Sequence, residues 1–421
     1  MSTHITMNEQ QTEAITSLLE YIQNPDPDSW FFVLRGFAGT GKTFCMQKVV
    51  QVAAGSQVEF AFTAPTNKAA KVLRNIVGEA STIYSLLGLR IDKSGELKEL
   101  VAGKVPDLSD LNVVFVDEGS MVSRNLFNIL GARAELHDFR VVFLGDPAQL
   151  PPVGEAESPI WECDSDACLT KVVRHDNQIL KLVTQIRGLI GHPAPSISLK
   201  SDNDGAEGVW KMTKAAFKMS IHEAAARGEF ADGTVSKVIA WRNIRVAEYN
   251  DLIRQAIFGV AAVPGEYLVG DRIVAAAPCL REAETLMATD EEALVDGVKV
   301  CKHPLEPRYT AIELKVITEN GETKRLLVIH PSSVQQFNND SERLAHEARG
   351  NGKLWSSFWA HKELFHEVKY AYALTTHRSQ GSTYQNVWVD YDDILYNRNR
   401  TEAFQCLYVA CSRPTTRLYL A

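Results

Sequence analysis

The sequence predicts an α/β fold with two α/β regions, each built on a parallel sheet with helices on both faces, and a β-rich insertion in the second region. Apolar strands alternate with helical segments over residues 30–144, and the alternation resumes at residues 237–258. Strands that are apolar throughout are typical of parallel sheets buried on both faces. Between the halves of the second region, residues 267–329 have the alternating pattern of antiparallel strands.

The first α/β region begins with a helix, indicated by Ile15, Leu18 and Ile22 on one face. Residues 89–106 interrupt the alternation that follows, and the Ser94-Gly95 turn predicts a small hairpin there, with a surface loop as the alternative. The strands are predicted at residues 30–34, 58–62, 112–116 and 141–144, and the helices at residues 7–22, 43–54 and 67–77.

The second α/β region is discontinuous in sequence. Its predicted insertion contains a strand at residues 267–274 and a hairpin at residues 313–329 around the Asn320-Gly321 turn. The acidic stretch at residues 282–296 is expected to be a solvated loop, and His361 and His366 to be solvated helix residues. The flanking elements are predicted as strands at residues 237–241, 387–390 and 418–420 and a helix at residues 245–258.

Composition limits the class of protein but leaves its partner open. The 421 residues are 45% apolar and 23% charged, and no apolar run approaches the length of a membrane span. The N-terminus lacks the features of a signal peptide, and the seven cysteines contain no C-x-x-C pair, which argues against zinc and a disulfide framework. A net charge of −8 argues against a broadly basic surface, yet a narrow groove that binds nucleic acid needs few cations.

A phosphate-binding loop follows the first strand. Residues 36–43 match G-x-x-x-x-G-K-[ST] between a predicted strand and a predicted helix. The glycines allow backbone N–H groups to point inward, Lys42 is expected to reach the β- and γ-phosphates, and Thr43 to bind Mg²⁺. A glycine-rich turn that binds nothing is the alternative. The loop predicts nucleoside triphosphate binding by Gly36, Ala38, Gly39, Thr40, Gly41, Lys42 and Thr43.

Two further strand ends carry polar residues suited to phosphoryl transfer. Asp117 and Glu118 close the strand at residues 112–116, and are expected to hold Mg²⁺ and to orient the attacking water, respectively. Gln149 follows the strand at residues 141–144, where its amide can hydrogen-bond the γ-phosphate or that water. A solvated strand terminus is the alternative for the acidic pair.

Taken together, these motifs resemble those of superfamily 1 helicases, in the RecD-like branch that moves 5′→3′. The resemblance covers nearly the whole chain in order. It rests on Gln11, residues 36–43, 63–70, 81–84, 117–121, 145–153, 170–174, 241–243 with Asn250, 375–381 and 408–413.

The resemblance implies two RecA-like P-loop domains, each with an insertion. The first domain would comprise residues 1–86 and 109–172, with a β-hairpin wedge at residues 87–108. The second would comprise residues 173–277 and 367–421, with an SH3-like β-barrel and a helical part at residues 278–366.

The resemblance also implies residue roles. ATP would lie between the domains, with Gln11 reading adenine, Gln380 and Gly381 near the cleft, and Arg174 and Arg413 acting as arginine fingers. Leu100 stands about where relatives carry an aromatic wedge residue, which questions the strength of unwinding. The implied DNA contacts are Pro65, Thr66, Lys68, Thr82, Tyr84, Leu100, Pro152, Asn243, Thr375 and His377.

The expected function is therefore ATP- and Mg²⁺-dependent translocation on single-stranded DNA with 5′→3′ unwinding. Forked duplex DNA and a single-strand-binding protein or replisome component are expected partners, and a monomer in the cytoplasm of a bacterial or phage-infected cell is expected. Two alternatives stay open: a translocase that displaces proteins from DNA and unwinds weakly, and a nucleotide-switched DNA-binding module without motor activity.

Overall fold

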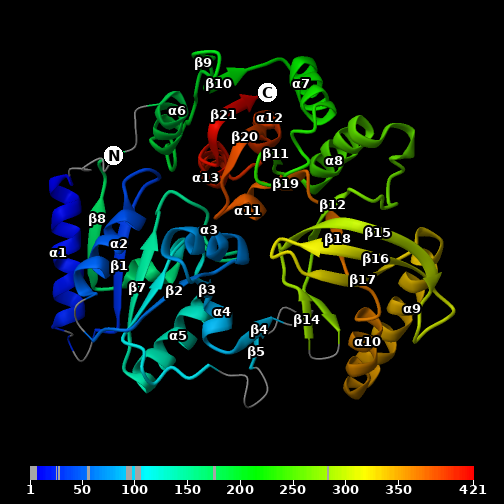
Figure 1. The fold of residues 1–421 in the computed structure, drawn as a ribbon, viewed down its shortest axis with the longest axis horizontal. Coiled ribbons are helices and arrows are strands. Elements are labelled where there is room, and N and C mark those ends of the chain that lie inside the picture. Colours follow the sequence, from blue (N-terminus) through cyan, green and yellow to red (C-terminus); the bar gives the residue numbers. More distant parts are fainter. Residues whose placement is uncertain are drawn as a thin grey trace.

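The computed structural model describes residues 7–24, 26, 29–54, 57–91, 97–99, 106–173, 177–281 and 284–421. Three β-sheets organise these residues (Figure 1). Two are mainly parallel, as the sequence predicts, and we call the parts built on them the first and second units. The third is an antiparallel sheet, drawn mostly in yellow in Figure 1, which belongs to the insertion. The α/β fold class with two parallel sheets is confirmed.

The sheet of the first unit is entirely parallel, in the order β3-β2-β6-β7-β1-β8. The four predicted strands are all present, and β3 and β8 extend the sheet at its two edges. The central strands are fully buried because both faces are covered. The strands are β1 (Phe31–Gly36), β2 (Phe60–Ala64), β3 (Ser81–Thr82), β6 (Val113–Val116), β7 (Arg140–Gly145) and β8 (Ser165–Leu169).

Helices pack on both faces of this sheet, each over its own apolar cluster. One cluster contains Leu18 of α1 and Met46 of α2, and the other contains Leu130 of α5. Asn8 caps α1 by accepting a hydrogen bond from the Gln11 N–H, and the Gln11 side chain accepts one from the Asn8 N–H. The helices are α1 (Glu9–Gln23), α2 (Lys42–Ala53), α3 (Asn67–Val77), α4 (Ile83–Leu86) and α5 (Arg124–His137).

The predicted hairpin before β6 is also present. Strand β4 (Leu89–Ile91) pairs antiparallel with β5 (Leu97–Glu99), as Figure 1 shows below α4. Leu100, the implied wedge residue, lies outside the described residues, so its role stays a prediction.

The sheet of the second unit has the order β19-β11-β20-β21-β10-β9, and only β9 is antiparallel to its neighbour. Its strands are β9 (Asp202–Asn203), β10 (Gly208–Lys211), β11 (Ser236–Ala240), β19 (Ala373–Thr375), β20 (Tyr384–Val389) and β21 (Pro414–Leu420). Its helices are α6 (Gln178–Arg187), α7 (Lys214–Ala226), α8 (Asn243–Phe258), α11 (Thr376–Ser379), α12 (Tyr391–Leu395) and α13 (Arg400–Cys411).

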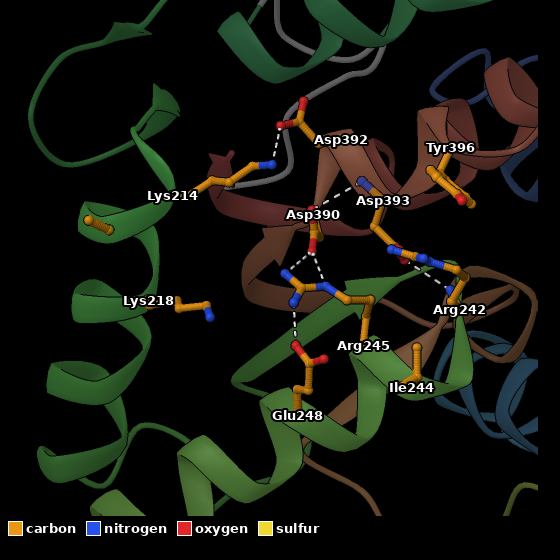
Figure 2. Close-up of a pocket in the computed structure, with 11 residues that line it drawn as sticks. Lys214, Lys218, Arg242, Ile244, Arg245, Glu248, Asp390, Asp392, Asp393 and Tyr396 are labelled. Carbon is orange, nitrogen blue, oxygen red and sulfur yellow. Dashed lines mark hydrogen bonds and ion pairs between the residues drawn. The ribbon is translucent and has the colours of Figure 1, made fainter.

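A pocket of about 700 Å³ lies at the carboxyl ends of β11 and β20 (Figure 2). Most of the charged side chains that line it are paired with one another. Arg245 pairs with Asp390 at 2.9 Å, Arg242 with Asp393 at 2.5 Å and Lys214 with Asp392 at 2.9 Å. Asp393 also accepts the backbone N–H groups of Trp241 and Arg242. These contacts fix the loop after β11 and with it the start of α8.

The insertion is built on an antiparallel sheet of order β17-β16-β15-β12-β18. The predicted hairpin around Asn320-Gly321 is confirmed, because β16 and β17 pair from Ala311 to Ile329. The strands are β12 (Arg272–Ala275), β15 (Glu292–Lys302), β16 (Thr310–Thr318), β17 (Thr323–Ile329) and β18 (Val368–Tyr370), beside the small hairpin of β13 (Cys279–Arg281) and β14 (Glu284–Met287).

Two expectations for the insertion are wrong. The acidic stretch at residues 282–296 is not a solvated loop, because it contains β14 and the beginning of β15. His361 and His366 are buried instead of solvated. His361 stacks on Phe337 with ring centroids 4.3 Å apart, and His366 hydrogen-bonds the Leu327 N–H and the Leu280 carbonyl. The first contact packs α10 (Trp355–Lys362) on α9 (Pro331–Gly350), and the second attaches the segment after α10 to β17 and β13. In the part of the chain described here, no helix combines the length and apolarity needed to cross a membrane.

A buried ion cluster joins the insertion to both units. Glu292 of β15 pairs with Lys68 of α3 at 2.9 Å and with Lys237 of β11 at 2.8 Å. All three side chains are at most 9% exposed. Burial raises the pKa of the Glu292 carboxyl, but the Lys237 and Lys68 charges outweigh it and hold that pKa at about 2. Burial lowers the pKa of Lys237 to about 8 against the opposing Glu292 charge. The cluster therefore remains ionised at neutral pH.

We expect Glu292→Gln to lower the free energy of unfolding by about 3–5 kcal/mol, because it leaves two buried lysines without a counter-charge. Denaturant unfolding measures this loss. The matched control is Asp296→Asn. Asp296 lies in the same strand as Glu292, and the substitution breaks its exposed ion pair with Lys315 of β16. The control should cost less than about 1 kcal/mol. Equal losses for the two variants would contradict the assignment of the cluster as a structural joint.

Candidate active site and nucleic-acid interface

The predicted catalytic loops of the first unit meet at one edge of its sheet. Strands β6, β7 and β1 are neighbours and parallel, so their carboxyl ends lie side by side. Residues 36–43 follow β1, Asp117 and Glu118 follow β6, and Asp146 and Gln149 follow β7. Open α/β sheets bind ligands at this edge. The three motifs therefore form a single site.

The loop at residues 36–43 has the backbone shape that its glycines predict. Gly39 and Gly41 adopt φ values of 79° and 94°, in the left-handed region that favours glycine. A Cβ at Gly41 would stand 2.5 Å from the Gln11 amide nitrogen. Helix α2 begins at Lys42, directly after this turn. The backbone thus forms the phosphate cradle expected before a helix N-terminus.

Gln11 packs against this cradle. Its amide nitrogen donates to the Thr40 carbonyl at 3.2 Å, while its amide oxygen accepts the Asn8 N–H at 3.2 Å. The side chain is only 2% exposed. In this arrangement Gln11 connects the cap of α1 to the phosphate loop, and adenine reading by it stays a prediction.

Lys42 lies opposite the acidic pair. Its Nζ donates to the Gly36 carbonyl at 2.5 Å, and its charge acts on both Asp117 and Glu118. Burial raises the pKa of Asp117 against the opposing Lys42 charge. Burial likewise raises the pKa of Glu118, opposed first by the Arg413 charge. Two adjacent carboxylates are a donor set that suits a divalent cation.

Glu118 is also held in an unusual backbone conformation. Its φ is 52° and its ψ is 38°, in the left-handed region that a non-glycine residue rarely adopts. Such conformations concentrate at functional sites, where the surrounding structure holds them in place. The Glu118 N–H donates to Asp117 Oδ1 at 2.9 Å, which holds the Asp117 carboxylate against the Glu118 backbone.

The second unit supplies the other wall of the cleft. Arg413 is 5% exposed, and its guanidinium donates to the carbonyls of Val409 and Ser382 and to the Ser412 hydroxyl. Among the charges that act on Glu118, that of Arg413 most strongly opposes the rise of its pKa caused by burial, so the guanidinium lies near that carboxylate. Arg174, the other implied arginine finger, lies outside the described residues.

Glutamine amides connect the two walls. Gln380 Nε2 donates to Gln149 Oε1 at 3.0 Å, and Gln405 Nε2 donates to the Gln149 carbonyl at 3.2 Å. Gln149 and Gln380 are both buried. Gly381, next in sequence, lies against α3, because a Cβ there would meet the Ala69 Cβ at 2.8 Å. The structure thus places Gln380 and Gly381 at the interface between the units.

One interfacial residue was missed by the sequence analysis. The Tyr408 hydroxyl accepts the Ala38 N–H at 2.9 Å and donates to Asp146 Oδ2 at 2.6 Å. Tyr408 begins the segment at residues 408–413 that was singled out for Arg413, and its place in that segment was the available signal. No sequence pattern indicated that its hydroxyl would reach the phosphate loop.

Several of the implied DNA contacts lie at the ends of neighbouring outer strands. Thr66 follows β2 and Thr82 ends β3, which pair through Ala64 and Thr82. In the second unit Thr375 ends β19 and pairs with Ala240, the last residue of β11, and Asn243 begins α8 just after it. Asn243 and Thr375 line one pocket of about 370 Å³ together with Tyr267, Tyr370 and Arg378.

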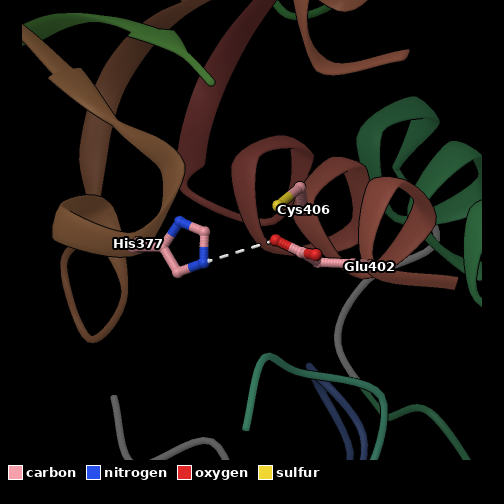
Figure 3. Close-up of side chains that lie close together, drawn as sticks. All are labelled: His377, Glu402 and Cys406. Atoms are coloured by element: carbon pink, nitrogen blue, oxygen red, sulfur yellow. Dashed lines mark ion pairs between the residues drawn. The ribbon is translucent and has the colours of Figure 1, made fainter. Parts of the chain in front are cut away.

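Other implied DNA contacts have partners within the protein. Lys68 is buried in the ion cluster with Glu292, so its side chain is not available to a DNA strand in this conformation. Pro65 and Pro152 are buried, and Tyr84 is partly buried. His377 faces Glu402 at 3.9 Å, and Cys406 lies on the same side of α13 (Figure 3). The ligand atoms of these three residues lie within 4.8 Å of one another.

Two family models match separate parts of the chain. An AAA domain matches residues 6–204, and a UvrD-like helicase C-terminal domain matches residues 370–421. Among curated proteins, the ATP-dependent DNA helicase dda of Enterobacteria phage T4 is 25% identical over 90% of this chain and 92% of its own length. The chain is homologous to superfamily 1 DNA helicases.

Two further relatives match the chain to different extents. An uncharacterized protein of Acanthamoeba polyphaga mimivirus is 24% identical over 98% of this helicase and 99% of its own length. The ATP-dependent RecD2 DNA helicase of Deinococcus radiodurans is 33% identical over 39% of this chain and 22% of its own length.

Solved structures show the same fold. A Pif1 helicase studied for DNA unwinding at forked duplexes aligns with 99% of this helicase and 92% of its own chain, with a TM-score of 0.54 at 16% identity. Pif1 helicase from Bacteroides in complex with ADP-AlF3 and single-stranded DNA aligns over the same shares, with a TM-score of 0.52 at 16% identity.

The Gln149–Gln380 contact yields a test of coupling between the walls. We expect Gln149→Ala and Gln380→Ala each to lower ATP turnover, with a double variant hardly worse than either single one. Contacting residues give interaction energies of about 0.5–3 kcal/mol in such cycles. Steady-state hydrolysis by the four proteins measures the coupling. Additive losses would show that the amides act separately.

Proposed function

We propose that the protein is an ATP-dependent 5′→3′ DNA helicase that moves along single-stranded DNA by opening and closing the cleft between its two units. One observation carries the proposal: the groups needed for hydrolysis are divided between two sheets. Lys42, Asp117 and Glu118 belong to the first unit, whereas Arg413 belongs to the second. Turnover therefore depends on how the units approach each other.

Each group has a role that its position supports. The cradle at residues 36–43 binds the phosphates with Lys42, while Glu118 and Gln149 orient the attacking water. Thr43 and Asp117 would hold Mg²⁺, which when bound neutralises charge on the phosphates. Arg413, and Arg174 by the family resemblance, stabilise the charge of the transition state when the cleft is closed. Hydrolysis removes the γ-phosphate that the arginines bind, and the units can then separate.

The segment at residues 375–384 supports a link from this cleft to DNA. It starts at the carboxyl end of β19, where Thr375 lies near the beginning of α8, and ends at the start of β20. Gln380 in its middle contacts Gln149 of the first unit. A DNA strand bound across Thr66, Thr82, Asn243 and Thr375 would thus follow the relative motion of the units. Hydroxyl and amide side chains suit contacts that are independent of base sequence.

The partners and organisation follow from this activity. Single-stranded and forked DNA are the substrates, and we propose a monomer that works with a single-strand-binding protein or replisome component in the cytoplasm of a bacterial or phage-infected cell. The hairpin at residues 87–108, including Leu100, is the proposed wedge, and residues 278–366 the SH3-like and helical insertion. The observed antiparallel sheet extends to β12 and β18 on either side of that range.

Two substitutions test the assignment of roles in the cleft. We expect Lys42→Ala to abolish hydrolysis by removing the phosphate-binding charge. Glu118→Gln should keep ATP binding and lower kcat at least about 100-fold, the usual scale for removal of a general base. Nucleotide binding and steady-state hydrolysis are measured for both variants. Normal hydrolysis by Glu118→Gln would remove Glu118 from the mechanism.

DNA dependence separates the motor from its alternatives. We expect single-stranded DNA to stimulate hydrolysis strongly, and duplexes with a 5′ tail, but not those with a 3′ tail, to be unwound. ATP binding without DNA-stimulated hydrolysis would instead indicate a nucleotide-switched module. Displacement of streptavidin from biotinylated DNA without unwinding of forks would indicate a protein-stripping translocase.

A further inference from the structure

Tyr408 makes a contact across the cleft that the proposed roles do not use. It lies on α13 of the second unit, yet both hydrogen-bond partners of its hydroxyl belong to the first unit. The oxygen accepts the Ala38 N–H, and the hydrogen is donated to Asp146. A tyrosine hydroxyl has one hydrogen to donate and lone pairs to accept with, so both bonds form at once.

The surroundings hold this hydroxyl in place. The Tyr408 side chain is 1% exposed and belongs to the apolar core of the second unit, against which Phe37 and Ala38 also pack. The Arg187 guanidinium lies 3.9 Å from the centre of the Phe37 ring. The tip of the phosphate loop is therefore held by the second unit.

The charge of Asp146 determines the direction of one hydrogen bond. Burial and the Asp146 carboxylate both raise the pKa of the Tyr408 hydroxyl, so it stays protonated and donates. The second carboxylate oxygen of Asp146 accepts the Ala148 N–H at 2.9 Å. Asp146 thus fixes the start of the segment that carries Gln149.

The Ala38 N–H has two possible acceptors. It belongs to the phosphate cradle, whose backbone N–H groups bind phosphate oxygens in loops of this kind. An N–H group makes one good hydrogen bond, so a phosphate oxygen that accepts it displaces the Tyr408 hydroxyl. The bond to Asp146 is unaffected by this exchange. Phosphate binding would therefore remove one of the two bonds through which the Tyr408 hydroxyl contacts the first unit.

We propose that Tyr408 is a positioning residue whose hydroxyl competes with the nucleotide for the Ala38 N–H and so reports occupancy of the phosphate loop to α13. Arg413 follows this helix directly, and its Nε donates to the Val409 carbonyl on it. A change at Tyr408 is thereby passed to the arginine finger. The inference rests on the proposed function, because only a nucleotide-driven enzyme would use it.

The test is Tyr408→Phe, which removes the hydroxyl and keeps the buried ring. Because the variant lacks the competitor, we expect it to bind a non-hydrolysable ATP analogue about three- to tenfold more tightly, the change that corresponds to a single hydrogen bond. The DNA-stimulated kcat should fall, because α13 no longer responds to the phosphate loop. A merely structural role would reduce the active fraction without tightening binding. Unchanged or weaker binding would overturn the proposal.

The matched control is Tyr249→Phe. The Tyr249 hydroxyl also donates to a buried carboxylate, Asp390 Oδ2 at 2.7 Å, but within the second unit and away from the phosphate loop. Its removal should leave the affinity for the analogue unchanged. Hydrolysis by the wild-type protein distinguishes a failure of the proposed function from a failure of the role of Tyr408. Without DNA-stimulated hydrolysis the proposed function fails, whereas with stimulation and unchanged affinity of Tyr408→Phe only the role of Tyr408 fails.

Discussion

The structure depends on the contact between the catalytic edge of one parallel sheet and the second unit. The strand ends of β1, β6 and β7 carry the phosphate loop, the acidic pair and Gln149, and groups of the second unit contact or lie near each of them. Gln380 and Gln405 hold Gln149, and Tyr408 holds both the phosphate loop and Asp146. These bonds are buried and directional, so small changes in how the units approach each other alter the site.

The same constraint would let the proposed DNA contacts respond to the nucleotide. The segment from Thr375 to Tyr384 crosses from the outer strand ends of the second sheet to its interface with the first unit. Gly381 allows the backbone to approach Ala69 on α3, the helix that Thr66 caps. Packed interfaces of this kind move between discrete arrangements because they deform little. The insertion takes part as well, since Glu292 joins α3 to β11.

Local patterns were sufficient for most of the fold and for the grouping of the site. The strand predictions in the two α/β regions, the hairpin before β6 and the Asn320-Gly321 hairpin all appear in the structure. The predictions failed where a polar residue finds its partner far away in sequence. Glu292 was expected in a solvated loop, and His361 and His366 were expected in solvent. Each is buried with a partner supplied by another element.

The sequence by itself determined the fold class, the phosphate loop and the order of the helicase motifs, because these depend on residues close together in the chain. Apolar alternation, glycine positions and strand-end carboxylates are local, and local chemistry fixes their meaning. Only the tertiary structure decided which groups face one another across the cleft. The bonds of Tyr408 to Ala38 and Asp146 span 370 and 262 residues, respectively. Nothing in the neighbouring residues encodes such a pairing, which arises when two separately formed sheets pack together.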